Sequence, residues 1–363
     1  MKIKDLCSYA PKSRIKAGEA VENAKYLFFT SSADENKRYT DFQFDKEAII
    51  MGTGGNATLH YYNGKFSVST DCLVLFPNSK IKCKYLYYFF KSHMSVLEAG
   101  FKGAGLKHTN KKYIEEINVS KVPDLSTQEK IVSHLDTITE NIEKLNREVE
   151  LFDSLTKARF IEMFGTLDDP ADEFEKATLK KLCNKITDGK HGGCTSEEGT
   201  QRYFVGAREI YDDEVHYDTA PEINVEEFEK DYKRCNIEIG DFLIVNTGAT
   251  IGKSAIASDE RTEHTLLQKS VALLKIKKDK LNPVFLKWCY RVNTRMYMVQ
   301  SASAQPNLLL SKINGTVIHV PSIEHQNQFA DFVQQVDKSR EEVKKSLEKT
   351  QQLYDSLMQE YFG

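Results

Sequence analysis

The sequence has no long apolar run. No uninterrupted apolar stretch in its 363 residues approaches the ~18 residues of a membrane-spanning helix. The start, Met1 to Asp5, has no apolar core of a signal peptide. Proline is scarce, with 8 residues, whereas 28% of the residues are charged and 40% are apolar. This composition excludes disordered, collagen-like and membrane chains and predicts a folded cytoplasmic protein without membrane association.

Paired cysteines are also missing. The seven cysteines include no Cys-x-x-Cys pair and their number is odd, which favours reduced thiols over a disulfide framework. His191 with Cys183 and Cys194 has no common zinc-ligand spacing and no fourth ligand. The sequence therefore predicts no metal site.

Motifs for catalysis are absent or incomplete. The segment Gly248 to Ser254 resembles a phosphate-binding loop, but three residues instead of four separate its first glycine from the Gly-Lys pair. The Gly52-x-Gly54 pattern lacks the strand–helix–strand context and the acidic partner of a dinucleotide site. We find no signature of an amino-methyltransferase, a nuclease, a serine hydrolase or a zinc protease. We therefore expect a chain without catalytic residues of its own.

The net charge of -3 hides an uneven distribution. Residues 1–121 carry 19 basic and 12 acidic side chains, and residues 242–319 carry 11 and 4. Residues 166–241, in contrast, carry 10 basic and 20 acidic side chains. Basic surface is the electrostatic footprint of a protein that binds polyanions, although solvated domains also carry such charge.

The chain contains an internal repeat. Residues 122–165 align without a gap on residues 320–363, at an offset of 198. Identical pairs extend along the whole alignment and include Val122/Val320, Pro123/Pro321, Gln128/Gln326, Glu143/Glu341, Leu155/Leu353, Glu162/Glu360, Phe164/Phe362 and Gly165/Gly363. A second alignment, at an offset of 202, joins Leu151–Leu155 to Leu353–Leu357 and differs from the first by about one helical turn.

Looser correspondences precede each copy of the repeat. They join Lys4-Asp-Leu-Cys7 to Lys180-Lys-Leu-Cys183, Thr53-Gly54 to Thr247-Gly248, and the aromatic run 85–90 to residues 285–290. The second region also holds an acidic insertion of about thirty residues, Arg208 to Asp241, that the first lacks. The chain is therefore organised as a globular region and a long helix, twice over.

Both repeated segments predict amphipathic helices of about 39 residues. Their apolar residues recur at alternating spacings of 4 and 3, the heptad pattern of a coiled coil. The expected seam comprises Ile131, Leu135, Ile138, Ile142, Leu145, Val149 and Phe152, then Val333, Val336, Val343, Leu347, Tyr354, Leu357 and Tyr361. Ser126 to Glu129 predicts a capping box at the first helix, and Gly165 predicts its end.

The predicted fold class is α+β, with a pseudo-twofold internal repeat. Because the first helix leads to the second globular region, the simplest packing is an antiparallel coiled coil that separates two mixed α/β domains. The expected boundaries are 1–121 and 166–319 for the domains and 122–165 and 320–363 for the helices. Such a separator suits a bipartite site on duplex DNA, and a generic coiled-coil spacer is the alternative.

Polar loops of both domains are the candidate DNA contacts. Lysine suits phosphates, whereas Asn, Gln, His and Thr can read base edges. The candidates are Thr53, Asn56, Lys107, His108, Asn110, Lys111 and Lys112 in the first domain and Lys190, His191, Thr250, Lys253, Gln305 and Asn307 in the second. Plain turns and solvated loops are the alternatives for these segments. The aromatic runs 85–90 and 285–290 favour buried helix faces over base-stacking platforms.

The whole chain resembles the specificity subunit of a Type I restriction-modification system. The similar features are the Val-Pro-x-x-x-x-Gln helix starts, the segment LTKARFIEMFG that ends at Gly165, the DGKHG loop at 188–192 and the TGATIG turn at 247–252. The first domain departs from this pattern, because Ala10 to Arg14 stands in place of the DGKHG loop. Contacts are therefore not transferred from one domain to the other.

The resemblance implies a division of labour. Each domain would be a target-recognition domain that reads half of an interrupted DNA sequence, and the helices would dock two modification subunits. Those subunits would methylate adenine with S-adenosylmethionine, and an ATP- and Mg-dependent restriction subunit would cut DNA. This chain would hold no cofactor itself. Two rival hypotheses are a coiled-coil structural adaptor that binds only protein and a self-contained DNA-modification enzyme.

Overall fold

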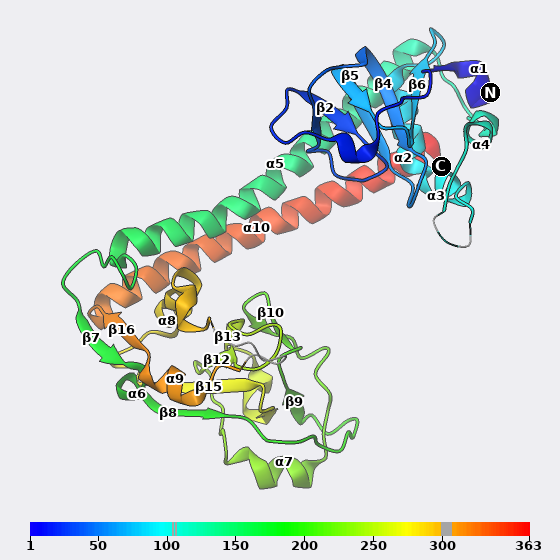
Figure 1. The fold of residues 1–363 in the computed structure, drawn as a ribbon. Helices are drawn as coiled ribbons and strands as arrows, with labels where there is room; N and C mark the ends of the chain where they lie inside the picture. The colour runs from blue at the N-terminus through cyan, green and yellow to red at the C-terminus, as the bar shows by residue number, and fades with distance from the viewer. Residues whose placement is uncertain (104, 106, 299–306) are drawn as a thin grey trace. The chain divides into compact units, whose positions relative to one another are not determined.

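The computed structural model describes residues 1–103, 105, 107–298 and 307–363, and the chain divides into two compact units (Figure 1). Unit 1 comprises Met1–Arg147 and Lys344–Gly363, and unit 2 comprises Glu148–Val343. Each unit contains one globular region and a stretch of both long helices, α5 (Leu125–Phe164) and α10 (Ile323–Phe362), which have 40 residues each. None of the described helices is both long and apolar enough to cross a bilayer.

Unit 1 is built on a mixed sheet, which has six strands among the described residues in the order β1-β6-β4-β5-β2-β3. The strands are β1 (Cys7–Tyr9), β2 (Tyr26–Phe29), β3 (Arg38–Tyr39), β4 (Phe44–Gly52), β5 (Leu59–Val68) and β6 (Cys72–Pro77). Neighbouring strands are antiparallel except β2 and β5. Successive side chains of β4 point to opposite faces, so that Ile49 and Met51 join one apolar cluster and Ala48 and Ile50 join another. The sheet is therefore buried on both faces at β4.

Short helices accompany the sheet of unit 1. They are α1 (Ile3–Leu6), η1 (Ala17–Glu19), α2 (Cys83–Ser92), α3 (Met94–Ala99) and α4 (Lys111–Glu116). The aromatic run 85–90 lies in α2, where Tyr85, Phe89 and Phe90 are buried in the same cluster as Leu135 of α5. The prediction that this run forms a buried helix face is confirmed.

Unit 2 holds a smaller antiparallel sheet, of four strands among the described residues in the order β13-β12-β15-β8. These strands are β8 (Cys183–Asp188), β12 (Phe242–Val245), β13 (Ser254–Ile256) and β15 (Val271–Ile276). Its side chains also alternate, with Ile244 and Leu274 in one cluster and Leu243 and Leu273 in the other. Three strand pairs accompany it: β7 (Glu175–Thr178) with β16 (Val317–Val320), β9 (Tyr203–Val205) with β14 (Thr265–Leu267), and β10 (Ile210–Tyr211) with β11 (Glu214–Val215).

The helices of unit 2 repeat part of the arrangement in unit 1. They are α6 (Leu179–Leu182), α7 (Val225–Tyr232), η2 (Glu260–His264), α8 (Pro283–Val292), η3 (Thr294–Met296) and α9 (Leu310–Gly315). Helix α8 corresponds to α2 and buries Phe285, Trp288 and Tyr290. The acidic insertion forms β10, β11 and α7, which explains why these elements have no counterpart in the shorter first domain.

The two long helices run antiparallel in both units. In unit 1 the start of α5 lies beside the end of α10, and a ring nitrogen of His134 lies 3.2 Å from the Tyr361 hydroxyl. In unit 2 the end of α5 lies beside the start of α10, and the ring centroids of Phe160 and Phe329 are 5.4 Å apart. The predicted fold class, mixed α and β domains with two antiparallel long helices, is confirmed.

Every residue of the expected heptad seam is buried or half-buried. Near the helix ends the seam residues pack into the cores of the globular regions, where Leu135 joins the aromatic cluster of unit 1 and Val333 joins that of unit 2. The seam thus fastens each helix to its domain as well as to the other helix.

The ends of α5 test two local predictions. The predicted capping box at Ser126 to Glu129 is wrong, because the carboxylate of Asp124 caps the helix and accepts a hydrogen bond from the backbone N–H of Thr127 at 3.0 Å. This bond and one from the Thr127 hydroxyl hold the pKa of Asp124 below its ordinary value. The predicted stop at Gly165 is confirmed, since its φ of +71° belongs to the left-handed region and an added Cβ would lie 2.2 Å from the Asp169 carbonyl oxygen.

A buried glutamine fixes the start of α5. Gln128 is fully buried, and its side-chain oxygen accepts the Lys82 N–H at 2.7 Å. Its amide nitrogen donates to the carbonyls of Lys80, at 3.2 Å, and Pro123, at 2.7 Å. The side chain therefore ties the helix start to the N-terminal end of α2.

The second copy of the repeat makes the same three bonds. Gln326, also fully buried, accepts the Asn282 N–H at 2.9 Å and donates to the carbonyls of Lys280, at 3.1 Å, and Pro321, at 2.8 Å. We call each of these arrangements the glutamine clamp. The repeat found in the sequence is thus a repeat of one structural joint.

We predict that Gln326→Ala destabilises unit 2. It leaves one N–H and two carbonyl groups at the joint without the side chain that satisfies them, which should cost about 2–4 kcal/mol. Denaturant unfolding followed by the fluorescence of Trp288, the single tryptophan of the chain, measures this loss in unit 2. The exposed neighbour Gln328 is the control, and Gln328→Ala should change stability by less than about 0.5 kcal/mol. Equal effects of the two substitutions would contradict the clamp.

Candidate nucleic-acid interface

A glycine turn and a later polar segment lie together in unit 1. The Thr53 carbonyl accepts the Thr109 N–H at 3.0 Å, and the Gly55 N–H donates to the Lys107 carbonyl at 2.9 Å. Gly54 also forms a bridge with His108, and a Cβ at Gly54 would come within 3.1 Å of the His108 ring. The fold therefore brings the predicted segments 53–56 and 107–108 into one loop cluster.

Unit 2 repeats this pairing. The Leu308 N–H donates to the Asn246 carbonyl at 2.7 Å, and Thr247 forms a bridge with Asn307. In both units the turn that follows a central strand therefore pairs with the segment that precedes a short helix, α4 or α9. We call these two arrangements the loop clusters of unit 1 and unit 2.

Most candidate side chains of unit 1 are exposed to solvent. Asn56, Lys107, His108 and Lys112 are exposed, and Thr53 is half-buried. These side chains are placed to meet a ligand in solution, because each lies in or next to the loop cluster.

Two further candidates in unit 1 have structural partners. The Asn110 side-chain oxygen accepts the Tyr113 N–H at 3.0 Å and so caps α4. The Lys111 ammonium lies 4.5 Å from the centroid of the Tyr9 ring and 3.5 Å from the Glu115 carboxylate. Their positions are therefore explained by packing around α4 without a ligand.

Lys190 in unit 2 is held by acidic residues. Its ammonium lies 2.8 Å from Asp231 and 3.4 Å from Glu227, and its side chain is 19% exposed. The hydrogen bond to Asp231 raises the pKa of Lys190 above its ordinary value. Lys190 therefore fastens the DGKHG loop to α7, whereas the neighbouring His191 is exposed, with its ring 3.3 Å from Asp188.

The other candidates of unit 2 lie around the TGATIG turn. Lys253 and Asn307 are exposed and Thr250 is half-buried, while Gln305 lies outside the described residues. A cavity of about 320 Å³ opens at this place and is lined in part by Thr247, Lys269 and Asn307.

Lys269 is the residue that sequence reasoning missed. It is exposed, and its backbone N–H donates to the Lys190 carbonyl at 2.9 Å, which places it between the DGKHG loop and the loop cluster. The basic excess of residues 242–319 was the available signal. That excess did not single out this lysine, because the contact joins residues 79 positions apart in the sequence.

The fold consists of two similar globular regions, each with a loop cluster and each packed on a stretch of two long helices. The chain belongs to the family described as Type I restriction modification DNA specificity domain, whose pattern matches residues 1–151 and 171–352. The resemblance drawn from the sequence is therefore confirmed.

Known proteins of this family are similar over parts or the whole of the chain. The EcoDI specificity subunit of Escherichia coli is 25% identical over 144 residues, covering 40% of this chain and 32% of that protein. The MjaVIII specificity subunit of Methanocaldococcus jannaschii is 22% identical over 340 residues, covering 85% and 78%. The chain thus spans about a third of the first relative's length and more than three quarters of the second's.

A solved structure shows the same fold. The Type I restriction-modification S subunit of M. genitalium superposes with a TM-score of 0.66 and 17% identity, and the match covers 100% of this chain and 95% of that one. At this identity the similarity establishes the fold, and the functional assignment depends on the family and the loop clusters.

We predict that Gly252→Ala destabilises unit 2 more than Gly248→Ala. Both glycines have φ near +100°, but a Cβ at Gly252 would lie 2.3 Å from the Tyr297 ring, whereas a Cβ at Gly248 would have nothing within 4 Å. The φ cost of about 1–2 kcal/mol is common to both variants, and overpacking adds about 1–3 kcal/mol at Gly252. Denaturant unfolding followed at Trp288 gives both values, and a larger loss for Gly248→Ala would be inconsistent with the turn described here.

Proposed function

We propose that the chain is the DNA specificity subunit of a Type I restriction-modification system. In this role it binds duplex DNA, and each unit reads one half of an interrupted target. The observation that carries the proposal is the duplicated loop cluster, in which a glycine turn is paired with a polar segment in both units. Membership of the family supports it, and favours neither a protein-only adaptor nor a self-contained modification enzyme.

The exposed side chains of the loop clusters suggest distinct roles. We assign Lys107, Lys253 and Lys269 to phosphates, since an exposed ammonium group gives affinity without base choice. We assign the amide, hydroxyl and imidazole groups of Asn56, His108, Thr250 and Asn307 to contacts with base edges. Lys190 is a positioning residue in this proposal, because Asp231 and Glu227 already occupy its ammonium.

The proposal leaves the chemistry to partner subunits. Two modification subunits would bring S-adenosylmethionine, and a restriction subunit would bring ATP and Mg, in the cytoplasm. The contribution of this chain is the choice of the DNA site.

Exposed leucines on the long helices suggest where the modification subunits bind. Leu151 on the unit 2 stretch of α5 is 58% exposed, and Leu353 on the unit 1 stretch of α10 is 52% exposed. The two residues correspond in the repeat at the offset of 202. A repeated apolar residue that the fold leaves exposed fits two copies of one partner.

We predict that the loop clusters control separate halves of one methylated motif. Deletion of the gene should abolish methylation at an interrupted adenine motif, and the wild-type gene should restore it. Asn56→Ala with His108→Ala should relax or change one half of the motif, and Thr250→Ala with Asn307→Ala the other half, because the two pairs belong to different units. Each lost bidentate base contact is worth about 1–3 kcal/mol of discrimination. Methylome sequencing of the complemented strains provides the measurement.

Two controls accompany the loop variants. Asn110→Ala removes a helix cap and should lower stability by about 1 kcal/mol while leaving the motif unchanged. A deletion strain with an unaltered methylome, although its modification genes are expressed, would refute the proposed function. Changes that spread over both halves with either pair of variants would refute the assignment of one half to each unit.

We predict that the exposed leucines set the number of bound modification subunits. Leu151→Ser and Leu353→Ser should each remove one copy, and the double variant should remove both, because each substitution replaces an apolar contact by a polar group. Native mass spectrometry of the reconstituted complex counts the copies. Ile161, 39% exposed on α5, is the control position, where Ile161→Ser should leave both copies bound. An unchanged count in the double variant would place the contact elsewhere.

A further inference from the structure

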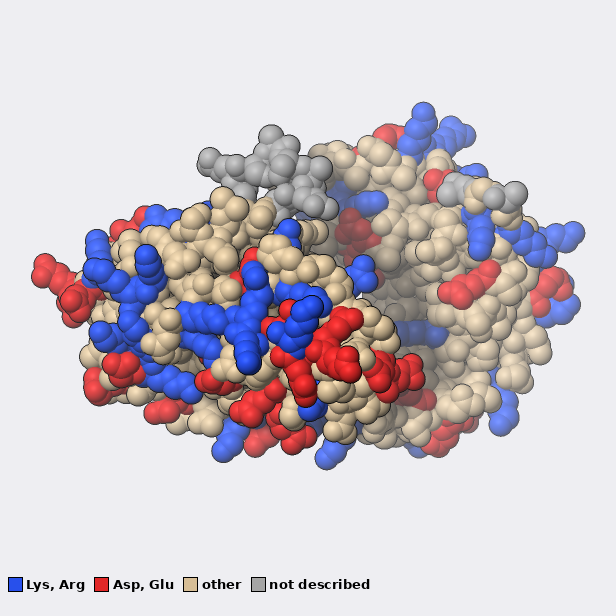
Figure 2. All heavy atoms as spheres, turned by 90° about the horizontal axis from the view of Figure 1, so that it is seen from below, with Lys and Arg blue, Asp and Glu red and all other residues tan. Residues whose placement is uncertain are grey.

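A group of lysines gathers at one end of the unit 2 sheet. Lys180 and Lys181 lie in α6, just before β8, whereas Lys277, Lys278 and Lys280 follow β15. The Lys277 ammonium donates to the Lys181 carbonyl at 2.8 Å, so the two segments are in contact. Figure 2 shows basic side chains gathered on this face of unit 2, with acidic side chains beside them. We call these five residues the lysine patch.

The lysine patch is largely unneutralised. Lys180, Lys181, Lys278 and Lys280 are exposed, and none of the five forms an ion pair with an acidic side chain among the described residues. Asp279 is the one acidic residue within the segment 277–280. The neighbouring Lys275 differs, since its ammonium lies 3.1 Å from both Glu238 and Asp241.

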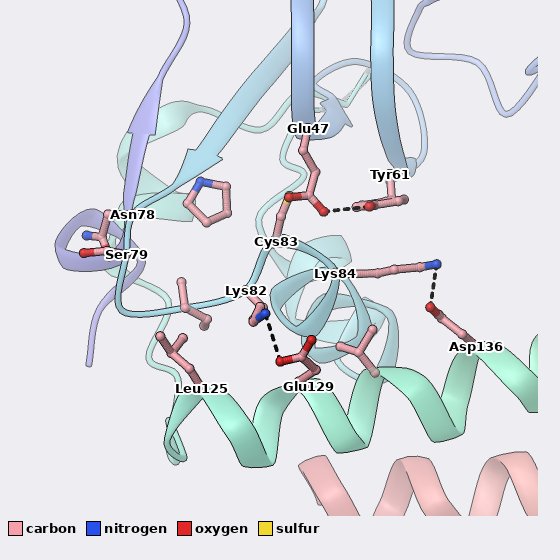
Figure 3. A pocket seen from close by; sticks show the side chains of 13 residues that line it. Glu47, Tyr61, Asn78, Ser79, Lys82, Cys83, Lys84, Leu125, Glu129 and Asp136 are labelled. Atoms are coloured by element: carbon pink, nitrogen blue, oxygen red, sulfur yellow. Dashed lines mark hydrogen bonds and ion pairs between the residues drawn. The ribbon is translucent and has the colours of Figure 1, made fainter.

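The equivalent end of unit 1 is built differently. There a cavity of about 720 Å³ opens between the sheet, α2 and α5 (Figure 3). Its lysines are paired, with Lys82 at 3.3 Å from Glu129 and Lys84 at 2.8 Å from Asp136. The counterpart of Lys180 is Lys4, which pairs with Glu116 at 2.7 Å. Lys80, the counterpart of Lys280 in the clamp, is exposed and forms no ion pair among the described residues. Unit 1 thus forms the same joint with one free lysine in place of a group, so folding does not require the whole lysine patch.

The lysine patch lies away from the loop cluster of the same unit. Strands β8 and β15 pair antiparallel, with Asp188 beside Ala272 at one end and Cys183 beside Ile276 at the other. The DGKHG loop and Lys269 adjoin the first end, and the lysine patch adjoins the second. Five residue steps of a strand span about 17 Å. The lysine patch is therefore a surface separate from the loop cluster, with the length of these strands between them.

We propose that the lysine patch binds the phosphate backbone of DNA outside the half-site read by unit 2. Lysine is depleted at protein–protein interfaces, where arginine and aromatic residues are enriched, and the lysine patch contains neither. Flexible ammonium groups without base-reading neighbours suit sequence-independent phosphate contacts. The proposal rests on the proposed function only in taking the ligand to be duplex DNA.

The test uses the full chain and a triple variant, Lys180→Gln, Lys181→Gln and Lys280→Gln. Lys277 is retained because its side chain bonds to the Lys181 carbonyl. Binding to a random-sequence duplex is measured between about 50 and 200 mM salt. Each lost phosphate contact lowers the slope of log Kobs against log salt by about 0.9, so the variant should lose about 2–3 units of slope. A matched control, Lys230→Gln with Lys233→Gln on the acidic side of the same domain, should leave the slope unchanged.

A second measurement separates this proposal from the proposed function. Wild-type chain bound to an immobilised duplex should capture a second, free duplex, and the triple variant should capture several-fold less. The methylated motif in cells should stay the same, because the lysine patch reads no bases. An unchanged slope and capture with an intact motif would overturn the lysine patch alone. Loss of the modification subunit with an unchanged slope would also overturn it, in favour of an acidic protein surface.

Discussion

The structure depends on the burial of one amide side chain at the start of each long helix. Gln128 and Gln326 each satisfy one N–H and two carbonyl groups of the main chain in a place closed to water. A buried amide without these partners would be costly. The helix start, the preceding proline and the start of α2 or α8 therefore form together. The recognition loops are positioned by the domains that these joints hold.

The sequence predicted the features that repeat or have a period. The duplication follows from an alignment at an offset of 198, and the antiparallel packing follows from the order of the regions along the chain. The long helices and the buried aromatic runs follow from patterns within a few turns of chain. The sequence did not reveal why Gln128 and Gln326 coincide, because two of the three partners of each side chain lie more than 40 positions earlier. The cap of α5 was misplaced by two residues, since Ser126 and Asp124 are both good capping residues and only the backbone geometry distinguishes them.

The sequence predicted which segments form the candidate site, but it did not predict which of their side chains have structural partners. The sequence singled out the glycine turns and residues of the segments before α4 and α9 as candidates, and the fold showed that these segments pair. The partners of Lys190 required the fold, because Glu227 and Asp231 belong to an insertion that the first domain lacks. An acidic insertion can thus pair with a lysine of its own domain, and its charge alone says little about a ligand.

The side chains of the glutamine clamps form these hydrogen bonds only with main-chain atoms of their neighbours. Position 82 is lysine and its counterpart 282 is asparagine, yet both present the same N–H to the clamp. The hydrogen bonds of such a joint do not depend on which side chains its neighbours carry. Each globular region is thereby free to diverge in sequence while its attachment to the long helices stays intact, and under the proposed function such divergence would change its DNA preference.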